Sequence, residues 1–163
     1  MSSPASATRV IIREFAPGDE LAFRRLNEEW ILRYFTMEPK DEEALADPCR
    51  TILEPGGRIF LACRNGEAVG CCALLVRAPG EFELAKMAVT ASCQGTGIGR
   101  RLLEAAMAHA RASGAERLYL ETNSQLTPAI RLYESFGFCR IPPDRIVPSP
   151  YARSNVSMEV FLA

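Results

Sequence analysis

The segment that most constrains the fold runs from residue 81 to residue 121. A strand-like run over 81–89 precedes a glycine-rich connection, a helical repeat over 97–113 and a second strand-like run over 117–121. Gly114 is suited to end the helix, whose apolar face comprises Ile98, Leu102, Leu103, Ala106 and Ala110. A strand, a helix and a strand in this order form a crossover with parallel strands. We therefore expect an α/β fold with at least one parallel strand pair.

The rest of the chain adds strands and helices on both sides of this unit. Runs at 8–15, 58–64, 68–76, 138–141 and 156–162 are strand-like, and 20–35 and 126–136 repeat with helical spacing. Asn65-Gly66 predicts a hairpin between the second and third strands, and 36–50 suggests a loop containing a short helix. A chain of 163 residues is the usual size of one domain. We predict one mixed α/β domain over 1–163.

The charge balance excludes several classes of partner. Nineteen Lys and Arg residues face 20 Asp and Glu residues, a net charge of −1, which does not favour nucleic acid or an anionic membrane. Residues 1–8 have neither the basic start nor the apolar stretch of a signal peptide. No apolar run approaches the roughly 20 residues that span a bilayer. We expect a cytoplasmic protein without a membrane partner.

The six cysteines are interpreted as reduced thiols, because no export signal or Cys-x-x-Cys pair accompanies them. Cys71 and Cys72 are neighbours in a predicted strand and should point to opposite faces. With His109 as the single histidine, we expect no metal site. Trp30 lies on the apolar stripe of its helix and is expected in the core.

Five carboxylates between residues 36 and 50 allow two interpretations. They could form an ordinary solvated helix face, or a negative rim that attracts a cationic amine. The residues concerned are Glu38, Asp41, Glu42, Glu43 and Asp47.

The connection before the long helix has the character of a phosphate site. Gly95, Gly97 and Gly99 leave main-chain N–H groups uncovered, and the helix start and Arg100 add positive charge. A Walker P-loop is excluded because no Lys-Ser/Thr follows these glycines. A dinucleotide fingerprint is the main rival, with Glu121 as its acidic residue, but Arg100 replaces the third glycine. The glycine-rich connection could also be a flexible turn that binds no ligand, or a coenzyme A site.

Two motifs in order resemble the signatures of the GCN5-related N-acetyltransferase (GNAT) superfamily. Gln94-Gly95-Thr96-Gly97-Ile98-Gly99 is similar to that family's Q/R-x-x-G-x-G/A motif. The run from Leu120 to Asn123 and the later Leu132-Tyr133-Glu134 before Gly137-Phe138 look like its second signature. The close resemblance covers residues 81–141. It implies a mostly antiparallel central sheet with the parallel crossover described above, flanked by helices.

The resemblance also implies a cosubstrate, acetyl-CoA, and roles for particular residues. The strand backbone at Met87, Ala88 and Val89 would pair with the pantetheine arm, often helped by a bulge that separates the two parallel strands. Asn123 would contact the arm, and Tyr133 matches the general acid. The pyrophosphate would be wrapped by Gln94, Gly95, Thr96, Gly97, Ile98, Gly99 and Arg100.

The chemistry of acetyl transfer agrees with these roles. Attack of an amine on a thioester forms an oxyanion and expels a thiolate, so an N–H donor and an acid are needed. A main-chain N–H near Val89 could stabilise the oxyanion, and the phenol of Tyr133 could protonate the thiolate, although helical spacing alone also suits a packed core tyrosine. Glu83, with Glu81 behind it, is the candidate base, and both could instead be solvated strand residues. No cysteine lies where an acyl carrier is expected, so we predict direct transfer.

Three functions remain in view. The first is an N-acetyltransferase acting on the amine of a small molecule or peptide; the others are a non-catalytic acyl-CoA sensor and a nicotinamide-dependent oxidoreductase. The acceptor should lie between the first helices, the acidic loop and residues 142–154. The sequence leaves open the acceptor, the acyl length and whether the chain is a monomer or a homodimer.

Overall fold

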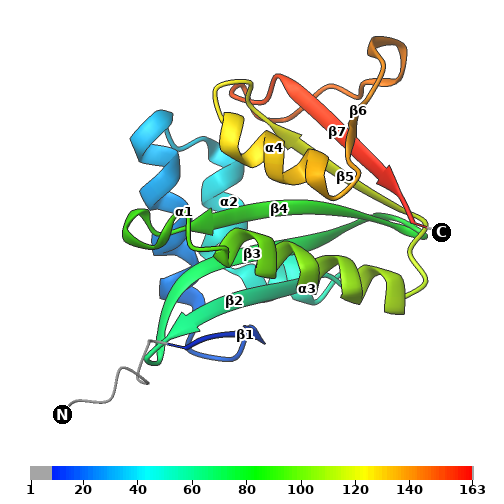
Figure 1. The fold of residues 1–163 in the computed structure, drawn as a ribbon. Coiled ribbons are helices and arrows are strands. Elements are labelled where there is room, and N and C mark those ends of the chain that lie inside the picture. Colours follow the sequence, from blue (N-terminus) through cyan, green and yellow to red (C-terminus); the bar gives the residue numbers. More distant parts are fainter. Residues whose placement is uncertain (1–8, 163) are drawn as a thin grey trace.

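The computed structural model describes residues 9–162, whose seven strands form one sheet in the order β1-β2-β3-β4-β5-β7-β6 (Figure 1). Residue 8, where the first strand was expected to begin, lies outside the described residues. The strands are β1 (Val10–Glu14), β2 (Arg58–Arg64), β3 (Glu67–Ala78), β4 (Glu81–Val89), β5 (Arg117–Thr122), β6 (Cys139–Arg140) and β7 (Val156–Phe161).

Four α-helices flank the sheet, with three short helical turns between elements. The helices are α1 (Glu20–Tyr34), α2 (Pro39–Ala46), α3 (Ile98–Ala112) and α4 (Thr127–Ser135), and the turns are η2 (Cys49–Leu53), η3 (Ala91–Cys93) and η4 (Pro143–Arg145). Every predicted helix is therefore present, and the short helix expected within 36–50 is α2. The predicted strand 138–141 is reduced to the two residues of β6.

The β4–α3–β5 crossover has the predicted parallel pairing. β4 pairs with β5 in parallel, and the other neighbouring strands in the sheet pair antiparallel. Parallel pairing runs only from Glu81–Arg117 to Leu84–Leu120. Beyond Leu84 the two strands separate, which Figure 1 shows as a fork opening from the end near the C-terminus.

A bulge in β4 lies where the strands separate. Cys71 pairs with Ala88 but Ala73 pairs with Ala85, so two residues of β4 stand opposite one residue of β3. Lys86 in this bulge has φ 54°, a left-handed conformation that costs a non-glycine residue roughly 1 kcal/mol or more. The bulge expected from the family resemblance is thus present in the sheet.

Each face of the sheet is covered by its own helices (Figure 1). α3 and α4 pack on one face, and α1, α2 and η2 pack on the other. The predicted apolar face of α3 is buried in the first of these cores. Cys72 belongs to that core and Cys71 to the opposite one, as their adjacent positions predicted, and both are fully buried because neither face is open.

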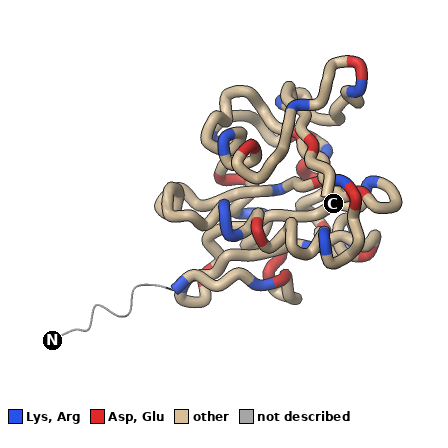
Figure 2. Tube along the Cα trace, turned by 45° about the vertical axis from the view of Figure 1, so that its right-hand side comes forward, with Lys and Arg blue, Asp and Glu red and all other residues tan. Residues whose placement is uncertain are grey.

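Charged residues of both signs are interspersed along the trace (Figure 2). The six cysteines are free thiols. Within residues 9–162, no helix is long and apolar enough to cross a membrane, and no three His, Cys, Asp or Glu side chains are grouped to hold a metal ion.

Candidate active site

A cleft of about 560 Å³ opens where β4 and β5 separate. Its walls come from β4, β5, the starts of α3 and α4, the end of α1 and the segment 151–154. All of the predicted site residues except Thr96 line it. These are Glu83, Met87, Ala88, Val89, Gln94, Gly95, Gly97, Ile98, Gly99, Arg100, Asn123 and Tyr133.

The loop before α3 presents main-chain donors to this cleft. The first intrahelical bond runs from the N–H of Arg101 to the carbonyl of Gly97, at 3.1 Å, so the preceding helical N–H groups have no helical acceptor. Within the described residues, the N–H groups of residues 95–97 also donate no hydrogen bond. Thr96 supports the loop, because its hydroxyl donates to the carbonyl of Cys93 at 2.5 Å.

The three glycines of this loop differ in backbone conformation and surroundings. Gly95 has φ +77° and Gly97 φ +86°, conformations that side chains disfavour. A Cβ at either position would meet no protein atom within 4 Å, so the space beside them is open to a ligand. Gly99 lies beside α4, where a Cβ would make an ordinary contact, 3.4 Å from Cδ2 of Leu132.

Arg100 joins the two predicted motifs. Its guanidinium lies 5.2 Å from the ring centre of Phe136, and Nη2 donates to the hydroxyl of Ser135 at 3.3 Å. The side chain is exposed. Positive charge, free N–H groups and open space therefore coincide, which is the arrangement that a diphosphate requires.

The main chain of Val89 turns one N–H toward the cleft. The N–H of Thr90 donates to the carbonyl of Val69 at 2.8 Å, so the next pair along, Val89 and Gly70, is non-hydrogen-bonded. Val89 therefore directs its N–H and carbonyl away from β3. The carbonyl accepts from the side-chain amide of Gln94 at 3.1 Å, and β5 no longer pairs at this level.

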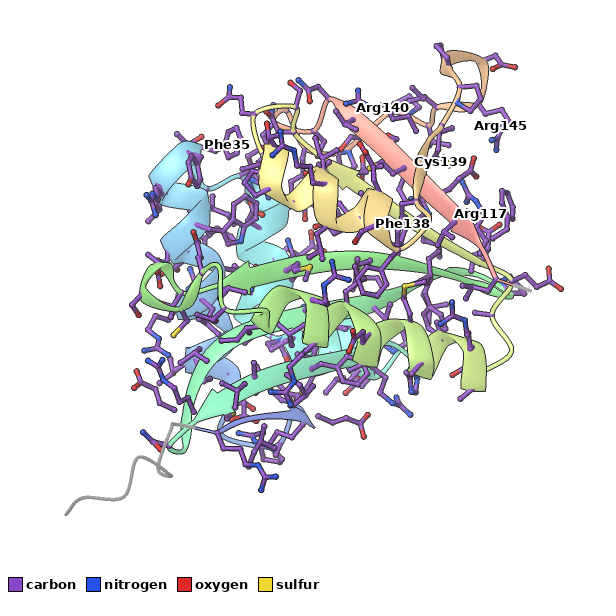
Figure 3. The ribbon with its side chains drawn as sticks, in the orientation of Figure 1. Phe35, Arg117, Phe138, Cys139, Arg140 and Arg145 are labelled. Atoms are coloured by element: carbon purple, nitrogen blue, oxygen red, sulfur yellow. The ribbon has the colours of Figure 1, made fainter. Side chains whose placement is uncertain are left out.

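Tyr133 lies on the opposite side of the cleft, on α4. Its ring packs edge-on against Phe138 at 5.9 Å, and Figure 3 shows Phe138 beside that helix. The hydroxyl has one weak contact, with Sδ of Met87 at 3.8 Å. Burial raises the pKa of this phenol well above its usual value, so the group is protonated at neutral pH. The raised pKa keeps the proton on the phenol but also makes it a weaker acid, and the packing against Phe138 suits a core tyrosine.

Two carboxylates line the cleft at its other end. Glu83 forms a 3.1 Å ion pair with Arg77, and burial, followed by the charge of Glu121, raises the pKa of its carboxyl. Oε1 of Glu121 is buried without a hydrogen-bond partner among the described residues. A carboxylate with a raised pKa is a stronger base than a solvated one. The predicted second candidate, Glu81, instead pairs with Arg117 at 3.4 Å.

Asp41 fits neither interpretation of the acidic loop. Its side chain is fully buried, and its two oxygens accept from Nη1 and Nη2 of Arg153, at 2.6 Å each. Nζ of Lys86 lies 3.3 Å from the same carboxylate and donates to the hydroxyl of Tyr151 at 3.0 Å. Glu38 caps α2 with Asp41 and also pairs with Arg153. These two acids neutralise cations rather than form an open negative rim.

Asn123 connects the end of β5 with the segment that carries Arg153. Its amide donates to the carbonyl of Arg153 at 2.7 Å, and its oxygen accepts from the N–H of Gln125 at 2.8 Å. The residue lines the cleft. Its expected contact with the cosubstrate remains a prediction.

Aromatic side chains from α1 form one wall of the cleft. Trp30, expected in the core, is partly buried: it packs against the core on the α1 side of the sheet and also lines the cleft together with Tyr34 and Phe35. The Trp30 and Phe35 rings meet edge-on at 6.4 Å, and Figure 3 shows Phe35 at the end of α1. The end of α1 thus contributes to both the core and the cleft, since Ile31 is fully buried whereas Tyr34 is exposed.

The acceptor was expected between the first helices, the acidic loop and residues 142–154, but Lys86 of β4 and Arg153, which both line the cleft, were not singled out from the sequence. Asp41 and Arg153 are 112 positions apart, and nothing in either local sequence indicates that they pair. Lys86 could have been noticed, because it is the one basic residue in the predicted strand 81–89.

The fold and this cleft define a class of protein that comparison identifies. The model of the Acetyltransferase (GNAT) family matches residues 23–138, and the chain belongs to that family. A mycothiol acetyltransferase of Thermomonospora curvata is 35% identical over 147 residues, covering 86% of this chain and 48% of that protein. The chain thus spans about half the length of this relative. An IAA acetyltransferase of Azospirillum brasilense is 36% identical over 121 residues, covering 74% of this chain and 76% of that protein.

Solved structures agree on the fold. An acetyltransferase of the GNAT family from Staphylococcus aureus Mu50 matches with a TM-score of 0.87 at 20% identity, covering 95% of this chain and all of that chain. An acetyltransferase from Streptococcus agalactiae matches with a TM-score of 0.82 at 23% identity, covering 94% of this chain and 98% of that one. The predicted GNAT-like fold is therefore confirmed.

Proposed function

We propose that this chain transfers an acetyl group from acetyl-CoA to the primary amine of a small molecule or peptide, by direct attack in a ternary complex. The observation that carries the proposal is the meeting of free main-chain donors, at residues 95–97 and Val89, with the Tyr133 hydroxyl in one cleft. Membership of the GNAT family supports the same reaction class.

Acetyl-CoA would be held mainly by the main chain. The N–H groups at the start of α3, with Arg100 beside them, would bind the diphosphate. The pantetheine arm would lie along Met87–Val89, where β4 has lost β5 as a partner. The thioester carbonyl would then accept the N–H of Val89, which is the donor that a developing oxyanion needs.

Transfer then moves one acetyl group and one proton. The amine nitrogen forms a bond to the thioester carbon, and the negative oxygen returns its electrons as the C–S bond breaks. Tyr133 would give its proton to the departing thiolate. The proton released by the amine would pass to Glu83 or Glu121, directly or through water, and the phenolate of Tyr133 would be reprotonated from solvent.

The proposed acceptor is a class of molecule, the primary amines of small molecules and peptides. Relatives of the chain are named for mycothiol and for IAA, so the names themselves point to more than one acceptor. The dinucleotide alternative loses support, because the strands of the described residues include one parallel pair and the chain belongs to the GNAT family.

Two measurements test the proposal. In a thermal-shift panel, acetyl-CoA and coenzyme A should raise the melting temperature, whereas NAD should not. Release of free thiol from acetyl-CoA should then depend on an added amine. Binding of acetyl-CoA without thiol release across a broad amine library would identify an acyl-CoA sensor, and stabilisation by NAD alone would identify an oxidoreductase.

A further inference from the structure

The acceptor end of the cleft contains side chains of both charges. Lys86 and Arg153 line it with side chains only 5% and 10% exposed. Glu83 and Glu121 line it as well, from β4 and β5. Asp41 and Glu38 do not line it, so the cations lie between the cleft and their own carboxylate partners.

Of the groups that contact the Asp41 carboxylate, Lys86 is the most distant. Asp41 already accepts two 2.6 Å hydrogen bonds from Arg153 and one of 2.9 Å from the N–H of Glu38, whereas Nζ of Lys86 is 3.3 Å away. Of the three N–H bonds on the ammonium, one points to Asp41 and one to Tyr151. One donor of a buried cation remains for a ligand in the cleft.

Whereas Lys86 has a spare donor, Glu121 has a carboxylate oxygen that accepts no hydrogen bond from the described residues. Its Oε1 is buried and has no hydrogen-bond partner in the described part of the chain. Such an atom costs free energy unless a ligand or water satisfies it. Glu83 lies next to it on the neighbouring strand, where Glu83 pairs with Tyr119. An ammonium group placed between them would give Glu121 a partner and would share Glu83 with Arg77.

The two charges are close enough for one small molecule to reach both. Glu83 and Lys86 are three residues apart on β4, which is roughly 10 Å at the rise of a strand, and the bulge shortens it. Both side chains line the same cleft, so the ammonium and the carboxylate attached to one α-carbon could each reach one of them. A simple amine would leave the spare donor of Lys86 unmatched, and a diamine would bring a second cation toward it.

We propose that the acceptor is a zwitterionic α-amino acid with an aromatic or large apolar side chain. Its ammonium would bind Glu121 and Glu83, its carboxylate would bind Lys86, and its side chain would pack on the wall of Trp30, Tyr34 and Phe35. The inference rests on the proposed function, because it names the acceptor of the same reaction.

The test compares three acceptors of one shape: L-phenylalanine, 2-phenylethylamine, which lacks the carboxylate, and L-phenylalaninamide, in which the carboxylate is neutral. The amine of phenylalanine is intermediate in basicity between the other two, so amine basicity alone cannot make it the best. We expect kcat/KM for phenylalanine to exceed both by about 10- to 100-fold, as for the loss of a charge-assisted hydrogen bond.

Lys86→Met is the matching variant, because it keeps the length of the side chain and leaves Asp41 paired with Arg153. The ratio of kcat/KM between phenylalanine and phenylethylamine should fall toward one, whereas the exposed Arg111→Met control keeps the ratio of the unaltered protein. A ratio near one before mutation, or a Lys86→Met variant with an unchanged ratio, overturns the amino-acid inference alone. Absence of thiol release with every amine overturns the proposed function and the inference together. Stabilisation by coenzyme A shows that Lys86→Met is folded.

Discussion

The hydroxyl of Tyr133 can be removed with little structural cost, because among residues 9–162 its one hydrogen bond is a long one, donated to Sδ of Met87 at 3.8 Å. We predict that Tyr133→Phe lowers kcat by about 100-fold or more, as expected for the loss of a general acid. The melting temperature and its increase with coenzyme A should stay close to those of the unaltered chain. Thiol release under saturating acetyl-CoA measures the effect. An unchanged kcat would assign Tyr133 to packing against Phe138.

Glu83 should set the acid limb of the pH–rate profile. Burial and the charge of Glu121 raise the pKa of its carboxyl, and a base must be ionised, so kcat/KM should fall as pH decreases through that raised value. Glu121→Gln removes the negative neighbour and should move the limb to lower pH. Glu83→Gln should lower the rate and abolish the limb. A limb that stays in place in both variants would show that another group accepts the proton.

Among elements, α3 offers a matched pair of glycines for testing the diphosphate site. Gly97 before the helix has φ +86° and Gly114 after it has φ +76°, and a Cβ at either would meet no protein atom within 4 Å. Alanine at either position should cost roughly 1–2 kcal/mol of folding free energy from backbone strain. Only Gly97→Ala should also weaken coenzyme A binding, by about tenfold or more, because its methyl group occupies the ligand's space.

Titration calorimetry with coenzyme A compares the two variants under identical conditions. If Gly114→Ala weakened binding as much as Gly97→Ala, the loss would come from general destabilisation, and the diphosphate would lie elsewhere.

The elements differed in how far the sequence could predict them. Periodicity predicted α3 and its buried face, and Asn65-Gly66 predicted the β2–β3 hairpin, because both signals are local. β6 shrank to two residues, since pairing at a sheet edge depends on what β7 offers and not on the strand's own sequence. Helical spacing placed Trp30 on the side of α1 that packs against the core, but it could not show that the same side chain also lines the cleft.

At the scale of the whole molecule, Asp41 connects α2, the β4 bulge and the loop before β7. Burial alone would raise the pKa of this carboxyl, but Arg153 and Lys86 outweigh it, and the net pKa is lowered from 3.8. A lowered pKa means that the carboxylate stabilises the fold above pH 3.8 and that this stabilisation is lost as pH falls below it. The pairing itself joins residues 112 positions apart, which is why no sequence pattern revealed it.

Asp41→Asn should therefore destabilise the protein at pH 7 by roughly 3–5 kcal/mol, because Arg153 and Lys86 lose a buried partner. Urea unfolding measures the difference, which should shrink when the comparison is repeated near pH 3. Asp47→Asn serves as the control, since its 3.7 Å pair with Arg50 is solvent-exposed and should contribute less than about 1 kcal/mol. Equal losses in the two variants would rule out a structural role for the buried pair.

Because β4 and β5 stop pairing after Leu84, the acyl donor and the acceptor would be recognised by different groups of the same strands. Past Leu84, the main-chain N–H and carbonyl groups of β4 are present whatever the side chains are. Under the proposed function, most side-chain substitutions there would leave binding of the thioester unchanged. Under the proposal above, recognition of the second substrate would depend instead on side chains that line the cleft from the same strands, such as Lys86 and Glu121. Mutation can thus retarget the acceptor while the acyl donor stays fixed, which makes this cleft a favourable starting point for redesign.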